Sequence, residues 1–224
     1  MKLMMPLFSR PLEFSEFQIP VIVIENHKVF YDIVSDIHNQ IEGIDGEVIL
    51  SEQGVPIDLE KKAKIIIDVF SLDCNERKIL SLLHKNLAEL AVKDKSYFEL
   101  KELQRSVNLF IQNLSDMISF PLSYSDEIPI LEIIKDVDLK FNFDSEKISE
   151  SLVNYLSVLR DFDKRSCFFI CNLRTWFDDQ DLQNFYKDVI YRKINIVLLE
   201  NHLEKVLEDY EICRIIDTDL CEIN

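Results

Sequence analysis

Glycine and proline are scarce in this sequence, with 3 Gly and 6 Pro among 224 residues. Flexible linkers depend on glycine and rigid ones on proline, so we expect no long linker. The sequence also lacks an apolar run of about 18 residues, the length that a membrane-spanning helix needs. Its opening, MKLMMPLFSRPLEF, is interrupted by two prolines and an arginine and does not have the pattern of a signal peptide. With 47% hydrophobic residues, the chain is predicted to be globular.

The cysteines do not have the spacing of a disulfide framework. There are five, an odd number, and they are scattered along the chain. Cys167 and Cys171 are four residues apart, but no further Cys or His lies near them in the sequence to complete a metal site. We therefore expect reduced, buried thiols in a cytoplasmic protein.

A nucleotide-binding loop is missing from the place where a first strand is expected to lead into a helix. Residues 18–25, QIPVIVIE, form a run typical of a buried strand, and apolar residues then recur at helical spacing up to Ile41, with Asn26 placed to cap the helix. The turn, IENHKVF, contains no glycine and no Lys-Ser or Lys-Thr pair, so its amides cannot wrap a triphosphate. A later strand, CFFICN, ends in Asn172 and not in an acidic Mg²⁺ ligand.

Signatures of other enzymes are also missing. The four histidines are scattered, and none is paired in sequence with a nucleophile or a second metal ligand: His27, His38, His84 and His202. The sequence therefore predicts a protein that is not an enzyme. A divergent nucleotide hydrolase and an acidic protein–protein adaptor remain the alternatives.

Strands and helices are expected to alternate over most of the chain. GEVILSEQGVPI is typical of a short strand and a turn, and Ile65 to Phe70 of a second buried strand. Further along we expect a helix in ILEIIKDV, a strand in LKFNF, a helix over residues 145–163, a strand in CFFICN, a helix in DQDLQNFYKDVIYR and strands in INIVLLE and EICRIID. This alternation predicts an α/β fold with a mainly parallel, doubly wound sheet.

Between residues 72 and 119 the pattern is helical only. Asn75 is placed to cap a helix that continues to about Leu90, and a second helix is expected from about Tyr97 to Met117. Two long helices with a short join predict a projecting helical hairpin, or leg. We therefore expect two domains: an α/β head formed by residues 1–71 and 120–224, and an α-helical leg formed by residues 72–119.

Charge is distributed unevenly along a strongly acidic chain. The net charge is -16, which disfavours nucleic acid as a partner unless the cations are segregated. Residues 61–105 contain ten Lys or Arg and seven Asp or Glu, so this segment carries +3 and the remainder carries -19. One interpretation is a solvated helix face with pairs such as Glu89–Lys93. The other is a surface that follows the phosphates of a nucleic acid.

An acidic cluster follows the predicted leg, at Asp126, Glu127 and Glu132. Carboxylates from a loop and a helix start suit a hard cation such as Ca²⁺, which binds about six to eight oxygens. The alternative is that the first two carboxylates complement the dipole of the helix that follows.

Three segments resemble the small ring-forming adaptation protein of type II-A CRISPR systems, and the similarity covers nearly the whole chain. They are VIVIENHKVFYDIV, DEIPILEIIKDVDLKF and RSCFFICNLRTWFDDQDLQNFYKDVIYRKINIVLLE. The shared features are a strand followed by Glu and Asp or Asn and then a Val-Phe helix start, an ILE-containing helix, and a late strand–helix–strand that ends in Glu. None is a catalytic fingerprint, and it is their order and spacing that make the resemblance specific.

The resemblance implies a degenerate P-loop-ATPase-like head, a helical leg and a homotetrameric ring that threads double-stranded DNA and prefers free ends. It also implies bound Ca²⁺, a role in spacer acquisition and antiviral defence, and the CRISPR integrase pair and effector nuclease as partners. The acidic stretch of the family aligns with Asp126, Glu127 and Glu132, but residues 117–125 lack carboxylates found in relatives, so weaker or fewer calcium sites are expected. The DNA-binding candidates are chosen from local charge: Lys78, Lys85, Lys93, Lys95, Lys101 and Arg105.

Overall fold

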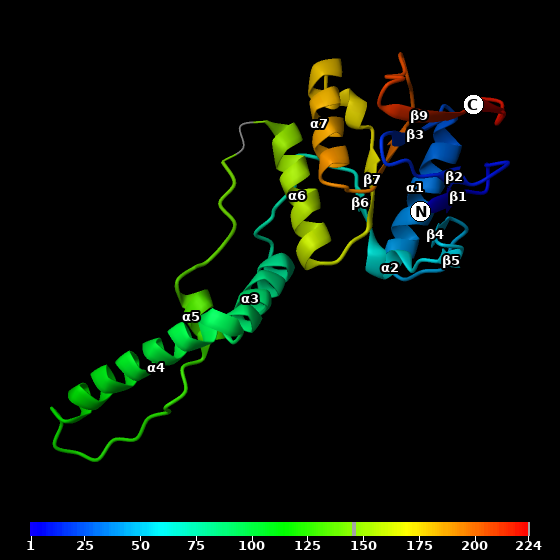
Figure 1. Cartoon of the computed structure of the whole chain (residues 1–224). Helices are drawn as coiled ribbons and strands as arrows, with labels where there is room; N and C mark the ends of the chain where they lie inside the picture. The colour runs from blue at the N-terminus through cyan, green and yellow to red at the C-terminus, as the bar shows by residue number, and fades with distance from the viewer. Residues whose placement is uncertain (145–146, 224) are drawn as a thin grey trace. The chain divides into compact units, whose positions relative to one another are not determined.

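The computed structural model of the chain describes residues 1–144 and 147–223, without the side chain of Asp94. The chain divides into two compact units (Figure 1). Met1–Cys74 and Phe143–Asn224 form one, here called the body, and Asn75–Asn142 forms the other, here called the helical unit. The helical unit extends beyond the residues 72–119 expected for a leg, because a helix formed after residue 119 packs within it.

The body contains a six-stranded sheet in the order β10-β9-β3-β8-β7-β6. Its five parallel strands are β3 (Ile19–Ile24), β6 (Ala63–Ile66), β7 (Cys167–Cys171), β8 (Ile196–Glu200) and β9 (Glu211–Ile216). The short β10 (Glu222–Ile223) adds an antiparallel edge. Every residue of β3, β7 and β8 is buried, as expected for parallel strands covered on both faces. The prediction of a mainly parallel α/β sheet is therefore confirmed.

Helices cover both faces of this sheet. Figure 1 shows α1 (His27–Ile41) on one face, and α6 (Ile148–Phe162) and α7 (Asp179–Tyr191) together on the other. The core on the α1 side takes alternate residues of the strands, such as Ile22, Phe169 and Leu199, with Ile33 and Ile37 of α1. The helix predicted for residues 145–163 begins at Ile148, and residues 145–146 lie outside the described part of the chain.

A second, antiparallel sheet completes the body, with strand order β2-β1-β4-β5. Its strands are β1 (Lys2–Met4), β2 (Leu12–Glu13), β4 (Ile49–Glu52) and β5 (Val55–Pro56), and the one-turn helix α2 (Leu59–Lys62) follows. Gln53 and Gly54 join β4 to β5 with positive φ angles of 51° and 81°, the conformation of a tight hairpin turn. The strand and turn predicted in GEVILSEQGVPI thus exist, but in this smaller sheet.

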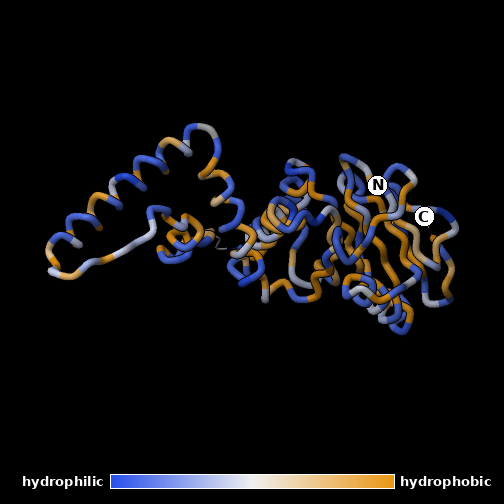
Figure 2. Tube along the Cα trace, turned by 90° about the horizontal axis from the view of Figure 1, so that it is seen from below, coloured by the Kyte–Doolittle hydropathy of each residue, from blue (hydrophilic) through white to orange (hydrophobic). Residues whose placement is uncertain are grey.

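The helical unit consists of α3 (Arg77–Ala91), α4 (Asp94–Ser115) and α5 (Ile130–Asp136). Most contacts of α3 within the unit are with α5, and α4 leads away from α3 instead of folding back along it (Figures 1 and 2). The two long helices therefore do not form the predicted hairpin. No described side chain of α4 is buried, although hydrophobic residues recur along its length (Figure 2).

Three local predictions were wrong. Residues 139–143, LKFNF, are not a strand, because Asn75 pairs with both the N–H and the carbonyl of Phe141 in place of a neighbouring strand. With its side chain used in this way, Asn75 does not cap α3, whose cap residue is Glu76. The second buried strand ends at Ile66, and Ile67 and Phe70 are exposed.

Candidate functional site

The turn between β3 and α1 is closed by its own side chain. Asn26 Oδ1 accepts hydrogen bonds from the amides of Lys28 and Val29 at 3.1 and 3.2 Å, which confirms Asn26 as the cap of α1. These amides are the groups that would bind a phosphate at a helix N-terminus. Asn26 Nδ2 also donates to the carbonyl of Thr218 at 3.3 Å, which fixes the turn to the segment after β9. The arrangement leaves these two donors already bonded within the protein.

A basic groove lies between α3 and α5 in the helical unit. It encloses about 590 Å³ and is lined by Asn75, Arg77, Leu80, Ser81, His84, Lys85, Leu131 and Lys135. Three of these residues are cationic, and none is acidic. An anion is therefore the charge type that this groove favours.

The groove follows from helical spacing and from three hydrogen bonds. Arg77, Ser81 and Lys85 are four residues apart along α3, so they share one face of the helix. Asn75 bonds the backbone of Phe141 at 2.9 and 3.1 Å, and His84 Nε2 bonds the carbonyl of Leu139 at 2.7 Å. These bonds tie the segment after α5 to α3 and so hold the two walls of the groove together.

The three cations of the groove differ in how far they are already neutralised. Lys135 Nζ lies 2.9 Å from Glu132 Oε1 in an exposed ion pair. Within the described residues, neither Arg77 nor Lys85 forms a salt bridge. Arg77 and Lys85 therefore offer the groove's unpaired positive charge.

The predicted DNA-binding residues are only partly brought together. Lys85 lines the basic groove, whereas Lys78 lies on α3 outside its lining and Lys93 precedes α4. On α4, Lys95 pairs with Glu99 at 3.6 Å, Arg105 pairs with Glu102 at 3.1 Å, and Lys101 donates to Gln104 at 3.0 Å. The exposed pairs on α4 match the interpretation of a solvated helix face. Arg77 and Lys135 were missed, although the i,i+4 spacing of Arg77 and Lys85 through Ser81 was a signal in the sequence.

The acidic stretch does not form a cluster that fits Ca²⁺ in this arrangement. Glu132 is paired with Lys135, while the backbone carbonyl of Asp126 accepts from Asn108 Nδ2 at 3.0 Å and the amide of Glu127 donates to Ser125 Oγ at 3.2 Å. Across residues 1–144 and 147–223, no group of three or more His, Cys, Asp or Glu is placed to hold a metal ion. Calcium needs about six to eight oxygens, so these carboxylates in a single chain do not supply a site.

A second cavity, here called the edge cavity, opens where β7 and β8 end in the body. It encloses about 540 Å³ and is lined by Arg174, Thr175, Phe177, Asp178, Asp179, Leu182, Glu200, Asn201, His202, Glu204 and Lys205. These residues come from the short helix η1 (Leu173–Thr175), the start of α7, the end of β8 and the loop that follows it. The carboxyl ends of parallel strands are where open α/β sheets bind their ligands.

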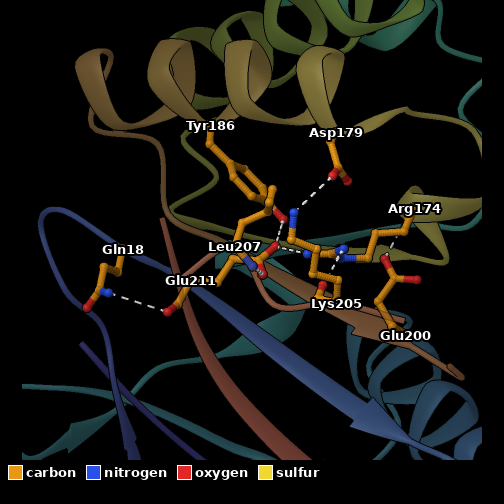
Figure 3. A network of polar contacts seen from close by, with 8 residues as sticks. All are labelled: Gln18, Arg174, Asp179, Tyr186, Glu200, Lys205, Leu207 and Glu211. Atoms are coloured by element: carbon orange, nitrogen blue, oxygen red, sulfur yellow. Dashed lines mark hydrogen bonds and ion pairs between the residues drawn. The ribbon is translucent and has the colours of Figure 1, made fainter. Parts of the chain in front are cut away.

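A buried polar network supports one wall of the edge cavity (Figure 3). Glu211 accepts hydrogen bonds from Tyr186 Oη at 2.6 Å and from the amide of Leu207 at 2.7 Å, and its carboxylate also pairs with the Arg174 guanidinium. Burial, then the neighbouring Glu211 charge, raises the pKa of Tyr186 above its usual range, so the phenol stays a donor. The network joins η1, α7 and β9 around one carboxylate.

Glu200 lies beside this network but outside its ion pair. Its residue is 2% exposed, and its Oε1 accepts from the amide of Arg174 at 3.2 Å, whereas the Arg174 side chain reaches toward Glu211 (Figure 3). No described residue forms a salt bridge with Glu200. Burial raises the pKa of Glu200 to about 7. None of the residues of this network was singled out as a functional candidate from the sequence.

Together these features define an α/β protein whose strand–helix turn is closed to phosphate and whose unpaired cations gather in a separate helical unit. The sequence model of a family described as CRISPR-associated protein (Cas_Csn2) matches residues 25–220. The chain belongs to this Csn2 family. The CRISPR-associated protein Csn2 of Streptococcus agalactiae is 22% identical over 206 residues, which cover 89% of this chain and 88% of that protein.

Family membership confirms the resemblance and supports a role in CRISPR adaptation. Within the described residues, no helix combines the length and the apolar character needed to cross a membrane.

Proposed function

We propose that the chain supports CRISPR spacer acquisition by binding double-stranded DNA, without reading its sequence and without cutting it, as a homotetrameric ring. The observation that carries this proposal is the basic groove, where Arg77 and Lys85 are free of ion pairs in a protein of net charge -16. Phosphate contacts by such side chains fix a protein on a duplex without selecting a sequence. The acidic remainder of the chain repels phosphate and so restricts where the duplex can bind.

One groove offers too few cations for strong binding, so the proposal requires assembly. Exposed hydrophobic side chains on and after α4 provide the surface for it, among them Phe98, Leu103, Leu109, Phe110, Leu114 and Met117. A surface this apolar marks an interaction site in a soluble protein. A second copy of the chain is a suitable cover, because a closed ring repeats each groove around a common opening. The integrase pair and the effector nuclease are further proposed partners, on the strength of the family.

The absence of catalysis in this proposal is supported by the closed turn at Asn26. A hydrolase of the P-loop type needs amides free to bind phosphate and a lysine among them, whereas here Asn26 occupies two of the amides. The body is then interpreted as a degenerate P-loop-ATPase-like head that keeps the sheet without the nucleotide. Robust release of phosphate from ATP or GTP in the presence of Mg²⁺ would contradict this part of the proposal.

Calcium binding is a separate prediction. Because a single chain does not cluster enough carboxylates, Ca²⁺ would have to bind weakly at Asp126 and Glu127 or where copies meet. Calorimetric titration of CaCl₂ into the protein at several concentrations tests this prediction. Binding that strengthens with protein concentration supports a site shared between copies.

Comparing linear with closed-circular DNA of equal length tests threading through a ring. The proposal predicts that the linear duplex is shifted in a gel at protein concentrations that leave the circle unshifted, because only a free end can enter a closed ring. Light scattering of the same samples should give the mass of four chains. Equal shifts of both DNAs would exclude threading, and a monomer that ignores DNA would favour the protein–protein adaptor.

A further inference from the structure

The edge cavity has the position and size of a ligand site. It lies at the carboxyl ends of β7 and β8, and its volume of about 540 Å³ falls within the range of small-molecule sites, roughly 300–1,000 Å³. It is distinct from the basic groove in residues and in the sign of its charge. DNA phosphate is therefore not the ligand that this cavity attracts.

Its cations are already engaged, whereas three of its carboxylates are not. Arg174 pairs with Glu211, and Lys205 Nζ lies 3.7 Å from Asp179 Oδ2. Asp178, Glu200 and Glu204 form no ion pair with any described residue. Asp178 caps α7 by accepting from the amide of Asp181 at 2.8 Å. The unpaired charge at the wall of the cavity is therefore negative.

Glu200 separates this cavity from an ordinary acidic surface. Its carboxyl is almost wholly buried, lines the cavity and has one hydrogen bond, from the amide of Arg174, and no ion pair within the described chain. A buried carboxylate without a counter-charge is costly, and the cost falls when a cation binds beside it. The protein keeps this group where a ligand can reach it.

We propose that the edge cavity binds an organic cation, an ammonium or guanidinium group, whose N–H groups donate to Glu200 and Glu204. A bare metal ion is not favoured, because no described residues are clustered with the geometry of metal ligands. A planar or tetrahedral N–H donor needs only the two or three acceptors that the cavity offers. The group has two sources, a small free amine or the lysine or arginine side chain of a partner protein.

Binding of such a cation is coupled to protonation. Glu200 faces Arg174 on η1, Asp178 and Asp179 at the start of α7, Glu211 on β9, and His202, Glu204 and Lys205 in the loop after β8. An ionised Glu200 attracts the cation and a protonated one does not. Since the pKa of Glu200 is about 7, the ionised fraction and hence the affinity rise about tenfold from pH 6 to pH 8.

Calorimetric titrations of the full-length chain with three probes at pH 6 and pH 8 test the proposal. Spermidine represents a free amine, acetyl-arginine amide presents a guanidinium in a peptide frame, and tetramethylammonium carries charge without a donor. We expect saturable binding of one of the first two, about tenfold tighter at pH 8, and none of the third. Tighter binding of spermidine identifies a free amine as the source, and tighter binding of acetyl-arginine amide identifies a side chain.

Glu200→Gln should weaken that binding at pH 8 by at least about tenfold and remove most of its pH dependence, because the amide cannot ionise. The matched control is Glu208→Gln, which removes one exposed charge from the same loop outside the cavity lining and should change affinity less than about twofold. His202→Gln is measured in parallel, since a protonated histidine also repels the cation at pH 6.

Glu204→Gln gives a second variant in the cavity at an exposed position, where folding is not at risk, and we expect a loss of about threefold. The proposal is overturned if neither donor probe saturates, if tetramethylammonium binds equally well, or if Glu200→Gln binds like the unaltered protein.

Discussion

Tyr186 Oη donates a hydrogen bond of 2.6 Å to Glu211 Oε1, and neither side chain reaches solvent. The bond joins α7 to β9, and the same carboxylate accepts from the amide of Leu207. The chain between β8 and β9 has no helix to hold it against the sheet. Glu211 therefore replaces helix packing as the anchor of this connection and of one wall of the edge cavity.

Tyr186→Phe should lower the free energy of unfolding by about 1–2 kcal/mol, because it removes one hydrogen bond to a buried charged group and keeps the ring. Urea unfolding followed by circular dichroism measures the change. Tyr191→Phe is the matched control, since Tyr191 is 87% exposed and should shift stability by less than about 0.5 kcal/mol. Equal effects of the two substitutions would show that the bond to Glu211 contributes nothing.

Arg174→Met should destabilise the protein more strongly, by about 3–5 kcal/mol, because it leaves Glu211 charged and buried without its cation. Arg105→Met breaks the exposed pair with Glu102 and should cost about 1 kcal/mol or less. Thermal unfolding of both variants under one buffer condition tests the contrast. A loss for Arg174→Met no larger than that for Arg105→Met would mean that Glu211 is protonated or resolvated without Arg174.

The stability of the protein should depend on pH through Glu200. Its folded pKa of about 7 lies above the ordinary carboxyl value of 4.5, so the folded state keeps a proton that the unfolded state releases. The free energy of unfolding contributed by this group therefore falls as pH rises from about 4.5 to about 7 and is constant above that.

Glu200→Gln cannot titrate, so its loss of stability between pH 5.5 and pH 8 should be about 2 kcal/mol smaller than that of the unaltered chain. Urea titrations at the two pH values measure the difference. Glu208→Gln should keep the pH dependence of the unaltered chain. The same dependence in Glu200→Gln would place the buried proton on another group.

Self-association should depend on the exposed hydrophobic residues of α4. Phe110→Ser removes a side chain that is 61% exposed and should lower the mass seen by light scattering toward that of a monomer, because the apolar contact surface is lost. Phe17→Ser alters a side chain of the body that is 74% exposed and should leave the mass unchanged. A full-size assembly of Phe110→Ser would exclude α4 from the interface.

The body was predictable because its strands are buried on both faces. The runs IPVIVI, CFFIC and IVLLE contain almost only residues that parallel strands accept, and Asn26 caps α1 by purely local bonds. LKFNF has the same appearance, yet Asn75, 66 residues away in sequence, takes its backbone bonds. The supposed hairpin failed for a related reason: apolar spacing shows that a helix has a face to bury but not what covers it.

The candidate sites were less predictable than the fold. Lys85 was identified from charge, whereas Arg77 and Lys135 gain their meaning from the packing of α5 on α3. The partners Arg174 and Glu211 are 37 residues apart, and periodicity carries no information about such a pair. A glutamate at the end of the apolar run IVLLE was the one visible signal of a buried carboxyl.

The salt dependence of DNA affinity in Arg77→Ala/Lys85→Ala tests the central claim most directly. Each lost phosphate contact should make the slope of log K against log salt concentration shallower by about 0.9 for every contact in the assembly. Lys28→Ala, an exposed lysine of the body, is the matched control and should keep the slope. The account predicts weaker binding with a shallower slope for the double variant alone; an affinity and slope equal to those of the control would contradict it.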